Sequence, residues 1–278
     1  MKLIEIIDQF LRDDQFELPL PSPVYQRLQG VMAKKTHDLR ELEKLVTYDQ
    51  SLTIRVLRMA NSAFYRGFQK VTTVREAIMR LGSNEVINIL LLISQRENFC
   101  TKDPWLSTIM HKLFQHSVAS AVGAQWIAGN CRFRFLRQEA FIAGLLHDVG
   151  KHFLITVVEK IKSSGKLAFS LNEELIEQAL AALHAEDGYF LLNKWGLPEE
   201  YCSIARNHHK ETIHPNDGLL AMVRLANTAC HKAGIGLKSD PSLILSTRPE
   251  VPWLAFSEAA TAALQVKVEE SLALTNLY

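Results

Sequence analysis

Apolar residues recur every three or four positions along most of this sequence, and that helical periodicity constrains the fold more than any other feature. In LIEIIDQFL, for example, Leu3, Ile7 and Phe10 fall on one face of a helix. Similar patterns continue along the chain, and no segment alternates apolar and polar residues strictly enough to predict a strand. We therefore predict an all-α protein.

Breaks in the pattern divide the chain. The prolines of ELPLPSP end the first helix, and the apolar pattern lapses again in CTKDP, residues 100–104. We predict a two-lobed helical bundle, with residues 1–100 as the N-terminal lobe and residues 101–236 as the second. Residues 237–278 are expected to form a C-terminal extension that ends in a helix. Within the second lobe, RQEAFIAGLLHDVGKHFLITVVEKI, residues 137–161, is predicted to be one helix.

Composition argues against several functional classes. The net charge of the 278 residues is +1, which gives no reason to expect a surface for nucleic acid or an anionic membrane. The longest apolar run, Val86–Ser94, is shorter than the ~20 residues that span a bilayer. The acidic residues in MKLIEIIDQFLRDD do not fit a secretory signal, and the 4 cysteines form no CxxC pair. We therefore expect a cytoplasmic protein with reduced thiols.

Polar residues with metal-binding chemistry lie in apolar helical segments of the second lobe. In FIAGLLHDVGKHFL, an imidazole and a carboxylate are adjacent at His147 and Asp148. Burying either group is costly unless it is paired or bound to a metal, and divalent transition metals accept both. Three further segments supply the same kind of group, at His116, His184 and the pair His208–His209. The set predicts a metal centre, although each histidine alone is also compatible with a hydrogen-bonded position in the core.

Lys151 lies four residues after His147 and three after Asp148, on the same face of the predicted helix. A metal ion would repel this lysine unless an anion lay between them, so we predict that Lys151 holds a phosphate. The five other histidines are expected at the surface or at helix ends: His37, His111, His152, His214 and His231.

These motifs resemble a known superfamily. The order His116, His147–Asp148, His184 and His208–His209 is similar to that of the HD metal-dependent phosphohydrolases, and closest to the layout of the HD-GYP phosphodiesterases. Over about residues 16–235 the chain looks more like the HDOD domain, a signalling relative. The likeness is carried by ELPLPSP, VTYDQSLTIRVLRMANSAFY, VREAIMRLG, EAFIAGLLHDVGK, HAEDGYFLLNKWGLPEEY and NHH. The second lobe is accordingly expected to be HD-like.

The resemblance implies a centre of one or two divalent ions, with Fe, Mn, Zn or Mg as candidates. By likeness, Asp148 would bridge the two ions. The first ion would be held by His116 and His147, and the second by His184, His208 and His209. HD hydrolases use such ions to generate a hydroxide that attacks phosphorus. Many HDOD proteins have lost these ligands and act in signalling.

Two positions depart from the HD pattern. HD enzymes usually place an aspartate in a late helix, where this chain has Asn227 in VRLANTA. An amide oxygen can bind a hard cation but brings no negative charge, so Asn227 is a weaker candidate ligand for the first ion. The His208–His209 pair is followed by HHKETIHPNDG rather than by a Gly-Tyr-Pro triplet. Cleavage of cyclic di-GMP of the HD-GYP type is therefore not expected.

Two functional classes remain open at this point. One is a bacterial signal-transduction module that keeps a metal and binds a partner protein, a nucleotide or a phosphoester. The other is a metal-dependent phosphohydrolase, for which Asp148 and Lys151 are the predicted catalytic residues. Whole-chain likeness and Asn227 favour the signalling module, whereas the retained ligands and Lys151 favour the hydrolase.

Overall fold

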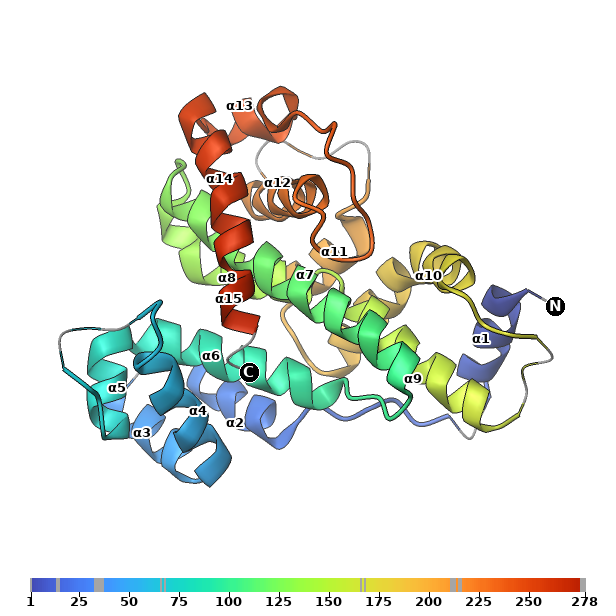
Figure 1. The fold of residues 1–278 in the computed structure, drawn as a ribbon, viewed down its shortest axis with the longest axis horizontal. Helices are drawn as coiled ribbons and strands as arrows, with labels where there is room; N and C mark the ends of the chain where they lie inside the picture. The colour runs from blue at the N-terminus through green and yellow to red at the C-terminus, as the bar shows by residue number, and fades with distance from the viewer. Residues whose placement is uncertain are drawn as a thin grey trace. The chain divides into compact units, whose positions relative to one another are not determined.

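The fold is seen in a computed structural model, which describes residues 2–13, 16–32, 38–65, 67, 69–165, 167, 169–210, 214 and 217–275 (Figure 1). Within these ranges every regular element is a helix, so the all-α prediction is confirmed. The described part of the chain divides into two compact units. Unit 1 comprises Met1–Pro19 and Phe99–Leu272, and unit 2 comprises Leu20–Asn98 and the last residues from Ala273.

Unit 2 is built from five consecutive helices: α2 (Pro23–Met32), α3 (Leu39–Thr47), α4 (Gln50–Ala60), α5 (Val74–Leu81) and α6 (Ser83–Asn98). The side chain of Asn61, just after α4, ties the α4–α5 connection to the end of α4. Its Nδ2 donates to the carbonyls of Leu57 and Val71, and its Oδ1 accepts from the Val71 N–H. Val71, near the start of α5, is thereby held beside the end of α4.

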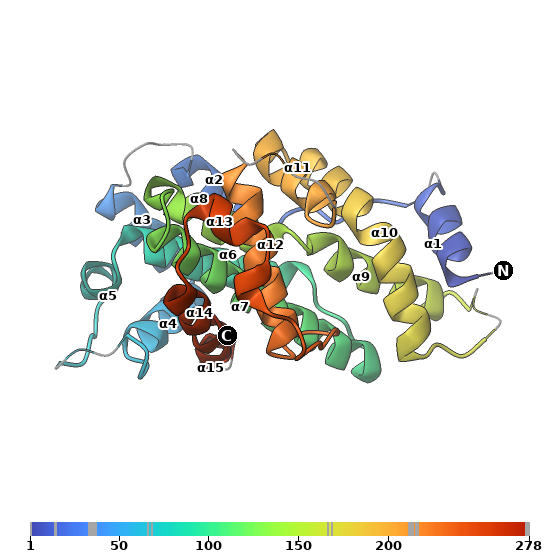
Figure 2. The ribbon, with the colours of Figure 1, turned by 90° about the horizontal axis from the view of Figure 1, so that it is seen from above.

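Unit 1 contains the remaining helices: α1 (Leu3–Leu11), α7 (Pro104–Gly129), η1 (Arg134–Leu136), α8 (Arg137–Leu146), α9 (Val149–Ser163), α10 (Glu173–Lys194), α11 (Glu199–Asn207), α12 (Gly218–Lys232), η2 (Leu245–Thr247), α13 (Glu250–Leu254) and α14 (Glu258–Glu270). The short α15 (Leu272–Thr275) straddles the division. The long, largely buried α7 packs against α8, α12 and α14, while α9 packs against α10 (Figures 1 and 2).

The observed division differs from the predicted one at both ends of the chain. Its main boundary, between Asn98 and Phe99, lies beside the predicted boundary at residue 100. However, α1 packs on α9 and α10, because Leu3, Ile6 and Ile7 bury their apolar face there, so it belongs to unit 1. The C-terminal segment likewise joins unit 1 through contacts of α14 with α7 and α12.

The segment Arg134–Ser163 is long and apolar enough to be considered as a membrane span, but 89% of its most apolar window is buried within the protein. That is the pattern of a core segment in a helical bundle.

The prediction of one helix over residues 137–161 is wrong, because the backbone leaves the helical path between α8 and α9. Asp148 has φ −106° and ψ 16°, and the N–H of Lys151 bonds to its carbonyl in a tight turn. His147 ends α8 and Asp148 precedes α9, so the turn brings both side chains to one point of the interior. Helical periodicity could not reveal this break, since the residues around it are as apolar as a continuous buried helix would require.

Two glycines allow α9 and α10 to approach closely. A Cβ on Gly150 would lie 2.0 Å from the carbonyl oxygen of His184 and 2.8 Å from the nitrogen of Gly188. Both neighbours are backbone atoms, so they can give way only if the two helices move apart. Because Gly150 is two residues from Asp148, this contact also fixes how closely His184 lies to that carboxylate.

Replacing Gly150 by alanine is therefore expected to force α9 away from α10. We predict that Gly150→Ala lowers the free energy of unfolding by about 3 kcal/mol, the upper range for an overpacked site. Gly129→Ala is the matched control in unit 1, because its Cβ would meet only the Arg137 side chain at an ordinary 3.5 Å. Urea unfolding followed by circular dichroism measures both, and equal stability of the two variants would contradict the close-approach argument.

Candidate metal centre

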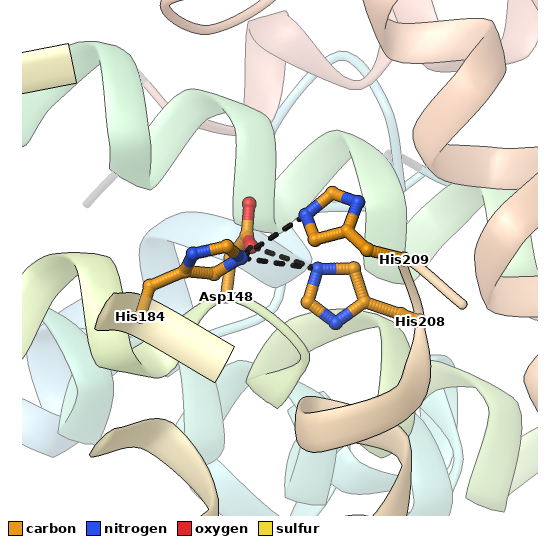
Figure 3. A group of neighbouring side chains, drawn as sticks. All are labelled: Asp148, His184, His208 and His209. Atoms are coloured by element: carbon orange, nitrogen blue, oxygen red, sulfur yellow. Dashed lines mark hydrogen bonds and ion pairs between the residues drawn. The ribbon is translucent and has the colours of Figure 1, made fainter. Parts of the chain in front are cut away.

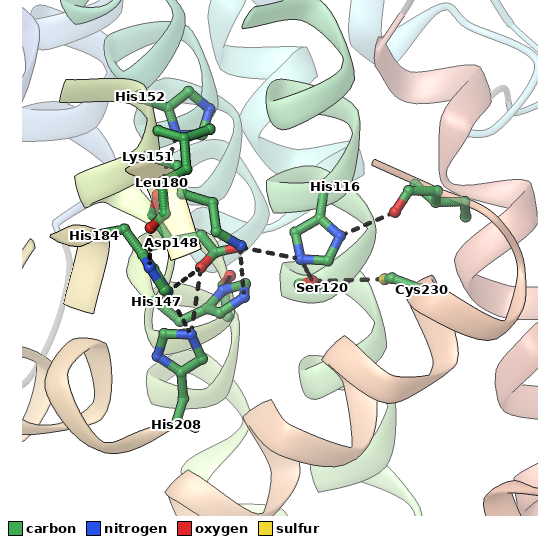
Figure 4. Close-up of polar contacts among 12 residues, drawn as sticks. His116, Ser120, His147, Asp148, Lys151, His152, Leu180, His184, His208 and Cys230 are labelled. Carbon is green, nitrogen blue, oxygen red and sulfur yellow. Dashed lines mark hydrogen bonds and ion pairs between the residues drawn. The ribbon is translucent and has the colours of Figure 1, made fainter. Parts of the chain in front are cut away.

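Asp148 lies at the middle of a buried cluster of histidines (Figures 3 and 4). Its Oδ2 is 3.4 Å from Nε2 of His116, on α7, and 3.4 Å from Nε2 of His147. Its Oδ1 is 3.5 Å from Nε2 of His184, on α10, and 3.3 Å from Nε2 of His208, just after α11. His209, which is exposed, completes the cluster, with its Nε2 3.1 Å from that of His184.

The cluster separates into two groups that share one carboxylate. In each group, the possible ligand atoms all lie within 4.8 Å of one another. The first group is His116, His147 and Asp148, and the second is Asp148, His184, His208 and His209. The structure thus brings together the six residues in the arrangement that the resemblance implied. Their binding of metal stays a prediction.

Backbone carbonyls fix the direction of four of the imidazoles. The Nδ1–H groups donate to the carbonyls of Ile235 (from His116, 3.0 Å), Gly144 (from His147, 2.7 Å), Leu180 (from His184, 2.6 Å) and Ala205 (from His208, 2.9 Å). A carbonyl can only accept, so each Nδ1 carries a proton, and in the neutral ring each Nε2 then carries a lone pair. Four lone pairs therefore point toward the oxygens of Asp148.

This arrangement fits a cation. His184 Nε2 lies 3.4 Å from His208 Nε2, although neither nitrogen has a proton to donate. His147 Nε2 and Asp148 Oδ1 are buried and have no hydrogen-bond partner among the described residues. Unpartnered buried acceptors of this kind are costly. Imidazole nitrogens with a carboxylate suit zinc, iron or manganese, and hydrogen bonding at Nδ1 is how metal-bound histidines are usually oriented.

Burial keeps the cluster in the protonation state that metal binding needs. It lowers the pKa of His147 well below its usual range and lowers the pKa of His184 to about 4. Burial alone would raise the pKa of Asp148, but Lys151 and then His147 oppose it, and the carboxyl pKa falls well below its usual value. The imidazoles of His147 and His184 are therefore neutral and the aspartate is charged near neutral pH.

Lys151 lies on the same side of Asp148 as the first group. Its Nζ is 2.5 Å from Asp148 Oδ2, the oxygen that also faces His116 and His147. The ammonium thus meets the carboxylate directly in this structure, and the predicted phosphate contact is not tested by it. The side chain is 13% exposed and lines the cavity above the cluster, so it is accessible to an incoming anion.

Asn227 is buried in α12, and its Oδ1 has no hydrogen-bond partner among the described residues. It precedes Cys230 by one helical turn, and the Cys230 sulfur lies 3.5 Å from the Ser120 hydroxyl. That hydroxyl is in turn 3.5 Å from His116 Nε2. Asn227 is therefore in the part of α12 that adjoins the first group, and its role as a ligand stays a prediction.

The five histidines outside the predicted metal centre were expected at the surface or at helix ends. This prediction is wrong for His152 and incomplete for His231. His152 is 1% exposed, packs 5.5 Å from Phe99, and has a pKa lowered by burial to about 4. His231 lies at the end of α12, yet its ring stacks 5.5 Å from that of His116 and lines the cavity. His111 and His214 are exposed as expected, and His37 lies outside the described residues. The apolar run FLITVV, which directly follows His152, could have predicted that this histidine is buried.

A buried ion pair supports the loop that carries His208 and His209. Arg224 on α12 donates from Nε to Glu250 Oε1 at 2.6 Å, and Glu250 is fully buried on α13. The Nη1 of Arg224 donates to the carbonyl of His208 at 3.4 Å and to that of Lys210. The Arg224–Glu250 pair is thus a positioning element for the second ligand group. Sequence analysis missed it, because neither residue lies in a metal-binding motif.

We predict that the metal-free protein loses stability as the pH falls from 7 to 5. His152 and His184 have folded pKa values of about 4, below the ~6.5 of an unfolded histidine. The unfolded chain therefore binds more protons in this window, and each buried histidine costs up to about 2 kcal/mol at pH 5. Urea unfolding in chelator at the two pH values measures the loss.

Two variants make this prediction specific. His152→Phe removes one depressed histidine beside Phe99 and should make the stability less dependent on pH. His111→Gln changes an exposed histidine and should leave the dependence as it is. An unchanged pH dependence in His152→Phe would contradict the assignment of a neutral, buried imidazole at that position.

Solved structures share this fold along nearly the whole chain. An HDOD domain protein of unknown function from Geobacter sulfurreducens has a TM-score of 0.75 and 22% identity, covering 99% of this chain and 98% of its own. A candidate metal-dependent phosphohydrolase from Shewanella amazonensis SB2B has a TM-score of 0.75 and 17% identity, covering 98% and 97%. A candidate signal transduction protein from Marinobacter aquaeolei VT8 has a TM-score of 0.66 and 19% identity, covering 100% and 60%. At these identities the similarity shows the fold.

Sequence comparison gives the family. A protein of Treponema pallidum (strain Nichols), described as uncharacterized, is 24% identical over 219 residues, or 75% of this chain. The chain spans 41% of the length of that relative. The profile of the HDOD domain matches residues 18–211. The chain belongs to the HDOD domain family.

Proposed function

We propose that this protein is a bacterial, cytoplasmic signalling module of the HDOD family that holds a divalent metal centre and uses it to bind a phosphate-bearing ligand. The observation that carries the proposal is the convergence of four Nε2 lone pairs on both oxygens of Asp148. Without a bound metal, an HDOD domain would gain no stability from keeping these four nitrogen atoms buried and aligned around one carboxylate. The bound ion would supply positive charge for an anionic ligand.

The protein's own residues would prepare the site for such a ligand. Asp148 presents one oxygen to each ligand group, while the carbonyls of Gly144 and Leu180 hold His147 and His184 in one tautomer. Lys151 lies at the boundary between the cluster and the cavity, where its ammonium can pass from Asp148 to an arriving phosphate. Because the ammonium is already paired, the ligand must offer an anion to replace that contact.

A metal-dependent phosphohydrolase is the second candidate, favoured by one observation. The two ligand groups share Asp148, and residues of both groups line a single cavity. A phosphorus centre there could meet both ion positions at once, which is the arrangement used for in-line displacement. In a hydrolase of this kind, Asp148 would set the two ion positions and Lys151 would neutralise charge on the phosphate.

Metal content is the first test of the proposal. We expect the chelated protein, reconstituted separately with zinc, manganese and iron and freed of excess metal, to retain one or two ions per chain by elemental analysis. Asp148→Asn should weaken retention by more than the roughly 10–100-fold cost of removing an outer-shell partner, because both groups lose the negative charge of their shared ligand. His111→Gln is the control that should retain the full amount. Equal retention by Asp148→Asn and the parent protein would overturn the metal centre.

Turnover then separates the two candidates. The metal-loaded protein is assayed with p-nitrophenyl phosphate and bis-p-nitrophenyl phosphate, alongside Lys151→Met. A signalling module should bind inorganic phosphate without releasing p-nitrophenol. Turnover that disappears in both Asp148→Asn and Lys151→Met, while Lys151→Met keeps its metal, would establish the hydrolase.

A further inference from the structure

The cavity above the cluster has three walls in addition to its floor. Its volume is about 200 Å³, and its floor is formed by residues of the two ligand groups. The α7 wall contributes Leu113, one turn before His116. The α10 wall contributes Glu177, Leu180 and Ala181, on the face that leads to His184. The third wall contains His231, Leu237 and Lys238, from the end of α12 and the turn that follows it.

That turn, Gly234–Lys238, is built onto the ring of His116. The carbonyl of Ile235 accepts the Nδ1–H of His116 at 3.0 Å. Gly236 has φ +112°, and a Cβ there would lie 3.1 Å from the His116 ring. Only glycine combines this backbone conformation with such a close approach. The turn is therefore held in place by a residue of the metal centre, and it delivers Leu237 and Lys238 to the cavity.

The charges around the cavity are unevenly distributed. Lys151, on α9 beside the floor, and Lys238, on the third wall, bring positive charge, while Glu177 on α10 brings the one carboxylate outside the ligand groups among the described residues that line the cavity. Glu177 precedes His184 by seven residues, or about 10 Å along the helix axis. A ligand that extends from the floor to Glu177 thus passes from a cationic region to a hydrogen-bond acceptor, between apolar surfaces of Leu180 and Leu237.

The size of the cavity limits the ligand. Pockets for drug-sized molecules have about 300–1,000 Å³, whereas this one has about 200 Å³. A dinucleotide would not fit within it, but a phosphate joined to a short hydroxylated carbon chain would. The carboxylate of Glu177 would repel a second phosphate and accept hydrogen bonds from hydroxyl groups.

We propose that Lys238 and Glu177 are specificity-determining residues, which select a small phosphorylated polyol with its phosphate at Lys238 and Lys151 and its hydroxyl groups at Glu177. This inference deepens the proposed function and rests on it for the placement of the phosphate above the metal centre. Lys238 lies beyond the residues matched by the HDOD profile, which end at 211.

Calorimetric titration with two probes tests the assignment. The probes are inorganic phosphate and glycerol 3-phosphate, and each is titrated into metal-loaded and chelated protein. We expect Lys238→Met to weaken binding of both probes by roughly 5- to 10-fold, the effect of losing one charge-assisted hydrogen bond at a partly exposed site. Lys194→Met is the matched control, since Lys194 is an exposed lysine of α10 that does not line the cavity. It should bind both probes like the parent protein.

Glu177→Gln distinguishes selectivity from general charge attraction. Removing the carboxylate should tighten binding of inorganic phosphate, because repulsion is relieved, and weaken binding of glycerol 3-phosphate, because hydroxyl groups lose their stronger acceptor. The ratio of the two affinities should change at least about 5-fold. Parent-like binding by Lys238→Met, or an equal shift of both probes in Glu177→Gln, would overturn the proposal.

Metal content distinguishes failure of the proposed metal centre from failure of the cavity assignment. If the reconstituted parent protein holds no ion, the proposed function is wrong, and the titrations of chelated protein decide the roles of Lys238 and Glu177 alone. If the parent protein holds its ions but binds neither probe, the cavity assignment is overturned while the metal centre stands. Metal content of Lys238→Met should equal that of the parent protein, because Lys238 belongs to neither ligand group.

Discussion

Hydrogen bonds from imidazole Nδ1–H groups to main-chain carbonyls set the geometry on which the rest of the centre depends. Three of the four carbonyls belong to helices of unit 1: α8 for His147, α10 for His184 and α11 for His208; the fourth, Ile235 for His116, lies in the turn after α12. The positions of the lone pairs are therefore determined by helix packing rather than by side-chain freedom. A change in the spacing of these helices would redirect a nitrogen even if every histidine were retained.

Protonation states explain how so many ionisable side chains can lie close together in a buried site. Burial favours the neutral form of ionisable groups; it lowers the pKa of His147 and His184, so these imidazoles are neutral, while Asp148 keeps its charge. Lys151 gives that charge a partner from the cavity side. The outcome is a site in which one buried carboxylate faces four imidazoles and one ammonium from the cavity side.

Much of this centre could be predicted from sequence. Apolar helical surroundings identified the six ligand candidates, and the structure places them together. The break between α8 and α9 could not be predicted, because a buried turn and a buried helix have the same apolar composition here. The positions of His231 and Lys238 beside the cavity could not be predicted either. They depend on the path of the Gly234–Lys238 turn back over His116, and helical periodicity gives no information about such a path.

The Arg224–Glu250 pair has a consequence for the limits of the folded unit. The residues matched by the HDOD profile end at 211, whereas both members of the pair come later in the chain. A fragment trimmed to the family boundaries would remove the guanidinium that binds the carbonyls of His208 and Lys210. One trimmed after α12 would leave that guanidinium facing the interior without its carboxylate, and an unmatched buried charge is severely destabilising. A fragment that keeps both members of this pair therefore extends at least through α13.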